Sequence, residues 1–230
     1  MIQAPQKSQR AFTLLELLIV VMVIGMLITI SIPAISALTT SSGLNTSARK
    51  VSNLIELARS RAIAGNTLTR FGVATDWPGD ASEAYKKCAI WEWDRDTLEF
   101  KQVQSWETLP GAVYFEFTEE PNYLSRGRYA ERNRSTTFGD FLLSSKASNA
   151  EFETDLKGDP VTVRYIDFKA NGRVKFPGAS GRNVILVLVN GAFDGGESLT
   201  YLEQGSGGEP TNWAQINVDQ LTGRPRIYRP

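Results

Sequence analysis

The residues of this chain that could do chemistry are carboxylates, arginines and a single thiol, because none of its 230 residues is histidine. The lack of histidine excludes the Ser-His-Asp and Cys-His nucleophile systems, histidine general bases and most zinc sites. The one cysteine, Cys88, lies in the stretch Lys87-Cys-Ala-Ile-Trp91, which is typical of a strand, so we expect a buried structural thiol. The sequence predicts a protein that is not an enzyme and that holds no cofactor and no metal.

Three pairs of carboxylates lie close together in the sequence, and such pairs can act as general acid and base where a cleft separates their pKa values. They are Asp94 with Asp96, Glu119 with Glu120, and Asp194 with Glu197. The residues around these three pairs do not indicate a cleft, so we expect the carboxylates to lie in solvent-exposed turns. The segment Asp194-Gly-Gly-Glu197 offers oxygen ligands to calcium, but it lacks the longer ligand series of an EF-hand loop.

Arginines gather at the C-terminus, where Arg224, Arg226 and Arg229 lie near Tyr228. Arginine binds phosphate and a tyrosine ring stacks on a base, so Arg224 and Arg226 are candidate DNA-binding residues. Charged side chains also protect an edge strand from pairing with another chain. Because 25 basic residues balance 25 acidic ones, the net charge of the chain does not favour DNA binding. We expect solvated or subunit-contacting arginines, and DNA binding remains the alternative. A second basic cluster comprises Arg126, Arg128, Arg132 and Arg134.

The chain has five tryptophans, and a row of exposed indole rings could bind a carbohydrate. Trp91 and Trp93 lie two residues apart, so they share one face of the expected strand. We predict that this face belongs to the core, and a lectin-like head remains an alternative.

These residues must be positioned by the elements of the chain, and the first of these is an apolar segment. The 27 residues 12–38 carry a single charge, Glu16. As a helix this segment is about 40 Å long, enough to cross a bilayer core of about 30 Å. Lys7 and Arg10 precede it, which places the N-terminus in the cytoplasm. A secretory signal peptide cleaved near Ala34-Ile-Ser36 and a plain signal anchor are alternatives, but neither explains the acid.

The stretch Arg10-Ala-Phe-Thr-Leu-Leu-Glu16 resembles the N-terminal processing and methylation motif of type IV prepilins and type II secretion pseudopilins. The resemblance implies that residues 1–11 are a leader, cut between Ala11 and Phe12 by a prepilin peptidase, and that Phe12 is then N-methylated. It also implies that Glu16 meets the Phe12 ammonium of a neighbouring subunit, and a buried ion pair of this kind would select one register. Ala11 departs from the usual glycine. Pro33 falls where family members often have a proline, and we expect a helix bend there.

Helical periodicity continues after the apolar segment. Small and apolar residues recur at spacings of three and four up to Gly65-Asn66, which predicts an amphipathic helix over residues 39–64 that continues into the head and packs on a sheet. The residues of this stripe are Leu44, Ala48, Val51, Leu54, Ile55, Ala58 and Ala62.

Residues 65–230 form a β-rich head in this interpretation. Alternating or β-branched segments separated by turn residues predict strands at Thr69–Ala74, Cys88–Asp94, Thr97–Gln104, Ala112–Phe117, Val163–Lys169, Arg173–Phe176, Val184–Val189, Ile216–Asp219 and Arg226–Tyr228. We expect an irregular stretch at Glu119–Asn149 with a short helix at Gly139–Leu143. Six glycines in Gly191–Thr211 predict a long exposed loop.

The fold class expected from these patterns is α+β: one long N-terminal helix packed on a mostly antiparallel sheet, which agrees with the pilin-like fold that the resemblance implies. Within the family, the segments Ile166-Asp-Phe-Lys-Ala-Asn-Gly-Arg-Val174 and Ile216-Asn-Val-Asp-Gln-Leu-Thr-Gly-Arg224 resemble the GspH/FimT-like minor pseudopilins. Gly223-Arg-Pro-Arg226 resembles the Gly-Arg-x-Arg element of FimT-like pilins that bind DNA.

The function implied by the resemblance is that of a subunit, a minor one, of a type II secretion pseudopilus or a type IV pilus. The implied partners are the prepilin peptidase, other pilin or pseudopilin subunits, and an assembly platform protein with its ATPase. The implied location is the bacterial inner membrane with a periplasmic head, followed by assembly into a filament. Two alternatives remain open: a DNA-binding minor pilin that acts through its basic tail, and a signal-anchored periplasmic binding domain unrelated to pili.

Overall fold

The computed structural model describes residues 14–117, 149–153, 160–175, 184–196 and 199–229, and it describes their side chains except at residues 27–41, 149–153 and 160. The chain divides into two compact units, Met1–Thr39 and Thr40–Pro230. One helix, α1 (Leu14–Ala64), begins in the first unit and ends in the second. The short helix expected at Gly139–Leu143 lies outside the described residues.

The second half of α1 carries the predicted apolar stripe. Every member of the stripe is buried, so the predicted amphipathic helix is confirmed. The helix ends where the sequence indicates: the N–H of Asn66 donates to the carbonyl of Ile63 (3.3 Å) and that of Thr67 to Ala62 (3.1 Å). Asn66 takes a left-handed conformation with φ of 47°. These are the two hydrogen bonds of a Schellman cap, in which asparagine can replace the usual glycine.

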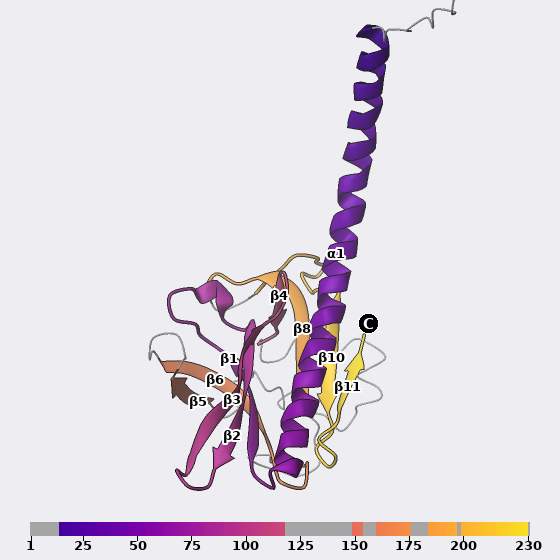
Figure 1. Cartoon of the computed structure of the whole chain (residues 1–230). Coiled ribbons are helices and arrows are strands. Elements are labelled where there is room, and N and C mark those ends of the chain that lie inside the picture. The colour runs from indigo at the N-terminus through magenta and orange to yellow at the C-terminus, as the bar shows by residue number, and fades with distance from the viewer. Residues whose placement is uncertain (1–13, 118–148, 154–159, 176–183, 197–198, 230) are drawn as a thin grey trace, which may run out of the picture. The chain divides into compact units, whose positions relative to one another are not determined.

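The first sheet is antiparallel throughout, with the strand order β3-β2-β1-β6-β5 and with β7 also paired to β6 (Figure 1). Its strands are β1 (Thr69–Ala74), β2 (Lys87–Asp94), β3 (Glu99–Thr108), β5 (Asn149–Glu153), β6 (Pro160–Phe168) and β7 (Val174–Lys175). The strands β2 and β3 form a hairpin around Asp94-Arg-Asp96, and β6 and β7 form one around Ala170-Asn-Gly172. A 3-10 turn, η1 (Ala81–Glu83), precedes β2.

The remaining strands form a second antiparallel sheet, whereas the sequence analysis expected one sheet. Its order is β11-β10-β8-β4, and β9 pairs with β8. The strands are β4 (Val113–Phe115), β8 (Val184–Ala192), β9 (Thr200–Tyr201), β10 (Trp213–Val218) and β11 (Pro225–Tyr228). Residues 184–191 are all buried, because β8 lies between β10 and β4 within this sheet. Strand patterns reveal which residues alternate but not which distant strands pair, so the division into two sheets was not predictable from them.

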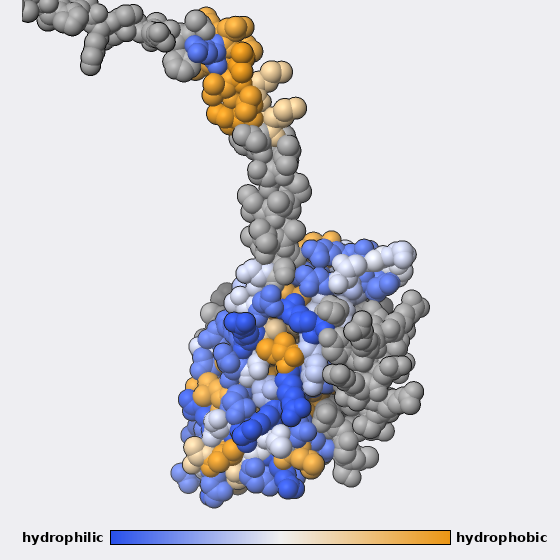
Figure 2. All heavy atoms as spheres, turned by 90° about the vertical axis from the view of Figure 1, so that its right-hand side faces the viewer, coloured by the Kyte–Doolittle hydropathy of each residue, from blue (hydrophilic) through white to orange (hydrophobic). Residues whose placement is uncertain are grey.

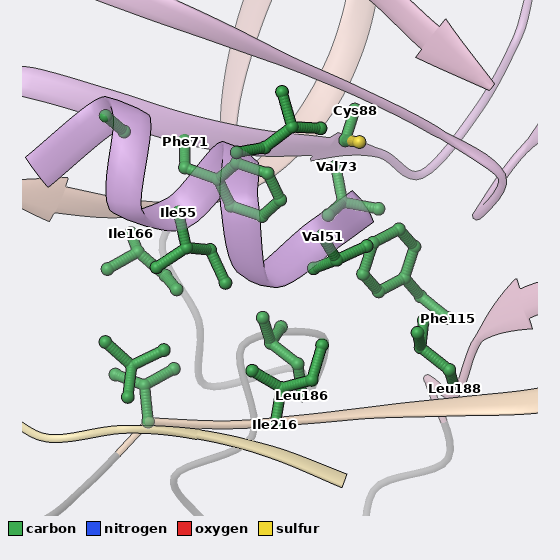
Figure 3. Packing of buried hydrophobic residues seen from close by; sticks show 14 of the residues in the cluster. Val51, Ile55, Phe71, Val73, Cys88, Phe115, Ile166, Leu186, Leu188 and Ile216 are labelled. Carbon is green, nitrogen blue, oxygen red and sulfur yellow. The ribbon is translucent and has the colours of Figure 1, made fainter. Parts of the chain in front are cut away.

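The core of the second unit lies where α1 meets both sheets. In Figure 3, Val51 and Ile55 of α1 point toward Phe71 and Val73 of the first sheet and toward Leu186 of the second. Each large apolar side chain removed from water in this way contributes about 1.5–3 kcal/mol of free energy. The helix is therefore the element that holds the two sheets together.

One expectation about the head needs correction. The stretch Gly191–Thr211 is not a plain exposed loop: β8 extends to Ala192, β9 pairs with it, and Leu199 is buried. The high glycine content of this stretch indicated a loop, but the short strand β9 forms there because it pairs with β8.

The prediction that the face of Trp91 belongs to the core is confirmed at Trp91. This side chain is buried in a core cluster with Ala89 and Val163, separate from the core cluster that contains Cys88, Ile90 and the stripe of α1. The side chain of Trp91 reaches across β1 at Gly72, where an added Cβ would lie 2.7 Å from the indole Cζ3.

Candidate assembly site and basic tail

The described N-terminal part of α1, Leu14–Met26, has apolar side chains around its whole circumference. Its large apolar side chains are between 46% and 85% exposed, and Figure 2 shows them gathered on the surface of this segment. A helix with no polar face gains free energy only when apolar groups surround it on all sides. This segment is therefore more stable in an apolar environment than in water.

Glu16 is the one charged residue of this segment, and it lies in the first turn of α1. A carboxylate there is stabilised by the free N–H groups and the positive dipole end of a helix. Ala11 and Phe12, the residues of the expected cleavage and methylation site, lie outside the described residues. Among the residues that the structure describes, no helix is both long enough and apolar enough to span a membrane.

Pro33 lies within the helical backbone of α1. A proline has no N–H, so the carbonyl one turn earlier, at Thr29, receives no hydrogen bond from it. The side chain of Pro33 lies outside the described residues, and a bend at this position stays a prediction.

The basic tail follows a tight turn between β10 and β11. The carboxylate Oδ1 of Asp219 accepts hydrogen bonds from the N–H of Thr222 (2.7 Å) and of Leu221 (3.1 Å). Burial alone would raise the pKa of Asp219, but these hydrogen bonds outweigh it and hold the pKa below its usual value. Arg224 and Arg226 are both exposed, and within the described part of the chain neither forms a salt bridge. The cluster between Arg126 and Arg134 lies outside the described residues.

The turn that precedes the tail also contacts α1, which the sequence analysis missed. The Nε of Arg59 donates to the carbonyl of Thr222 at 2.6 Å. Gly223 lies against Gly172 of the β6–β7 turn, and both glycines have left-handed backbones, with φ of 69° and 76°. The available signal was a glycine at the end of each of two turn motifs, Ala170-Asn-Gly172 and Leu221-Thr-Gly223. The first residues of the Gly-Arg-Pro-Arg element thus have a structural role.

The other candidate residues occupy structural positions where they are described. The Oδ1 of Asp94 accepts from the N–H of Asp96 at 2.7 Å, and an ion pair and hydrogen bond with Lys101, together with its backbone hydrogen bonds, lower its pKa to about 2. Asp194 accepts from the N–H of Gly196, while Glu197 lies outside the described residues. No group of three potential metal ligands occurs among the residues described. Burial raises the pKa of the Cys88 thiol to about 12.

The tryptophans pack on one another. Trp106 meets both Trp77 and Trp91 edge to face, with ring centroids 5.3 Å apart in each pair. The rings of such pairs cover part of each other's faces, which are the surfaces that a sugar would need.

Three comparisons place the chain among known proteins. A family profile described as the prokaryotic N-terminal methylation motif matches residues 6–32, the segment that contains Ala11, Phe12 and Glu16. Comparison with curated proteins gives no match. Two solved structures of the minor pseudopilin EpsH from the type II secretion system of Vibrio cholerae align at 12% identity, with TM-scores of 0.39 and 0.40. The alignments cover 81% and 83% of this chain and 97% and 98% of those chains. These comparisons identify residues 6–32 as a prokaryotic N-terminal methylation motif.

Proposed function

We propose that this chain is a minor structural subunit of a type II secretion pseudopilus or a type IV pilus. In this proposal a prepilin peptidase cleaves between Ala11 and Phe12, and Phe12 is N-methylated. Before assembly, the mature subunit is anchored in the inner membrane with its head in the periplasm. An assembly platform protein and its ATPase then add it to other subunits of the filament.

One observation carries the proposal: the methylation motif leads into a helix that is apolar on every side and has one acid, Glu16, in its first turn. Cleavage would make Glu16 the fifth residue of the mature chain and would create an ammonium at Phe12. In an apolar surround, a lone carboxylate is penalised by several kcal/mol unless a cation meets it. Pairing Glu16 with the Phe12 ammonium of a neighbouring subunit would satisfy both charges and set the register between the two helices.

The mature N-terminus tests the processing step. Intact mass and N-terminal peptide mass spectrometry of the protein from its native membrane should show a chain that begins at Phe12 and carries one extra methyl group. An intact Met1 would support the signal-anchor alternative, and a start near Ala37 would mean a cleaved secretory protein. Either result would overturn the proposal.

Glu16 tests the assembly step separately. We expect Glu16→Ala to be processed and to insert in the membrane but to be lost from sheared filaments, because the Phe12 ammonium would then lack its counter-charge. Glu56→Ala is a matched control: it removes a carboxylate from the same helix at a position where the carboxylate contacts Arg59 within the head. Filaments that incorporate Glu16→Ala as well as the control would contradict the assembly role.

A DNA-binding minor pilin is the second candidate function, favoured by the exposure of Arg224 and Arg226. If the tail binds DNA, Arg224→Ala/Arg226→Ala should keep its place in the filament and lose DNA uptake, because phosphate contacts are lost while the Gly223 turn is kept. Unchanged uptake would eliminate this candidate.

A further inference from the structure

The last strand, β11, is packed differently from the strand it pairs with. All six residues of β10 are buried, whereas β11 has no buried side chain: Pro225 and Tyr228 are half-buried, and Arg226 and Ile227 are exposed. The two strands pair over four residue positions. The strand β11 is therefore stabilised mainly by its backbone hydrogen bonds to β10 and by the contacts that the chain makes just before and just after it.

The end of β11 nearest to the turn is firmly held. Asp219 accepts two backbone hydrogen bonds within the turn, and Arg59 of α1 donates to the carbonyl of Thr222 at 2.6 Å. Gly223 is packed against Gly172, and the N–H of Val174 donates to the carbonyl of Gln220 at 3.1 Å. This end is joined both to the helix and to the first sheet.

Just beyond the other end of β11, the chain contacts α1 at the surface of the head. The Nη2 of Arg229 donates to the Oδ1 of Asn45 at 2.5 Å in an exposed hydrogen bond, in which Asn45 is exposed and Arg229 is half-buried. Asn45 follows Leu44, the first buried residue of the stripe that anchors α1 in the head. An exposed hydrogen bond between two side chains is weak, since water competes for both partners.

We propose that β11 is a strap that is hinged at Gly223, latched by the Arg229–Asn45 hydrogen bond, and able to open while the rest of the head stays folded. Opening breaks the β10–β11 ladder and the latch but leaves the Arg59 contact and the apolar core intact. Segments that bury little apolar surface open at a much lower free energy than the whole domain. The open strap leaves the outer edge of β10 without its partner strand. This proposal does not depend on filament assembly.

Hydrogen exchange of the full-length chain in detergent tests the strap. We expect the hydrogen-bonded amides of β11 to exchange about a hundredfold faster than those of β8, because β8 opens only with the core. If the amides of β11 and β8 exchange at one common rate, β11 opens only when the head unfolds, and the proposal fails.

The latch is tested by a matched pair of variants. Arg229→Ala should speed exchange in β11 by about three- to tenfold, the equivalent of one weak hydrogen bond, and should leave β8 unchanged. Arg226→Ala removes the same charge from an exposed position within β11, and it should leave the exchange of β11 unchanged. Equal acceleration by both variants would overturn the latch.

A covalent cross-link between positions 45 and 229 should have the opposite effect to Arg229→Ala, because it prevents the strap from opening. In Asn45→Cys/Arg229→Cys, a short bismaleimide should join the two thiols and slow the exchange of β11 toward the rate of β8. Cys88 does not interfere, because it is buried and its thiol pKa is raised to about 12. Unchanged exchange in the cross-linked protein would show that β11 opens without release of this contact and would also overturn the latch.

Discussion

Gly223 and Gly172 belong to turns of different sheets, and they lie so close that a Cβ on Gly223 would overlap the carbonyl oxygen of Gly172. The same Cβ would come within 3.1 Å of the Arg59 Cδ on α1. Three segments far apart in the sequence therefore meet at a point where no side chain fits. The contact fixes the ends of two hairpins against the last turns of the helix.

Gly223→Ala should consequently destabilise the head by about 2–4 kcal/mol, because strain from the left-handed backbone adds to the overlap with Gly172. Urea unfolding followed by tryptophan fluorescence measures the loss. Gly111→Ala is the control: Gly111 has a similar φ of 65° but no atom near its Cβ position, so only about 1 kcal/mol should be lost. Equal losses would show that the contact between the turns is not tight.

The buried ion pair between Arg70 and Asp167 should contribute to the stability of the head. The two side chains form a bidentate contact, with Nε to Oδ1 at 2.7 Å and Nη2 to Oδ2 at 3.0 Å, and both residues are less than 10% exposed. Asp167→Ala leaves the guanidinium buried without its carboxylate, so we expect a loss of about 3–5 kcal/mol in the free energy of unfolding.

An exposed pair serves as the control for this prediction. The Lys101 side chain is 57% exposed in its contact with Asp94, so Lys101→Ala should cost less than about 1 kcal/mol. Arg70→Met/Asp167→Leu should recover part of the loss of Asp167→Ala, since no charge is then left buried. The guanidinium of Arg70 also lies over the rings of Phe100 and Tyr165, with Cζ 4.0 Å and 3.5 Å from the ring centroids. A double variant that is as unstable as Asp167→Ala would mean that these ring contacts, rather than the buried charge, determine the loss of stability.

Acid should weaken the β10–β11 turn. The pKa of Asp219 is lower in the folded head than in the unfolded chain, so its contribution to stability is complete above the unfolded pKa of about 3.9 and is lost as the pH falls through the folded pKa. We expect the free energy of unfolding to fall between about pH 5 and pH 2, and to fall less steeply in Asp219→Asn. Asp96→Asn, in an exposed turn, is the control. A slope in Asp219→Asn that equals that of the parent would contradict the prediction.

Cys88 should act as a reporter of unfolding. Its side chain is buried, and burial raises the thiol pKa to about 12, so the reactive thiolate is scarce at pH 8. Maleimide should label the native protein no faster than the head unfolds, and it should label the urea-unfolded protein at once. Ser105→Cys, at an exposed position of β3, should take up one label rapidly in the folded state. Rapid double labelling of that variant would show that the core around Cys88 is open.

Local signals in the sequence were sufficient for α1, for most of the strands and for the methylation motif. The stripe from Leu44 to Ala62 predicted the buried face of α1, since helical spacing places those residues on one side whatever they pack against. Asn66 marked the helix end, and Asn171-Gly172 marked a hairpin, because few residues adopt left-handed backbones. The motif around Glu16 was readable because it is a continuous stretch of sequence.

The tertiary structure alone decided which distant segments meet. The division of the strands into two sheets, the placement of Trp91 in a core cluster separate from the stripe of α1, and the short strand β9 all depend on contacts between residues far apart in the chain. The same holds for Arg59 with Thr222 and for Arg229 with Asn45, which are separated by 163 and 184 positions. Periodicity records the face on which a side chain lies, and only the folded chain determines its partner.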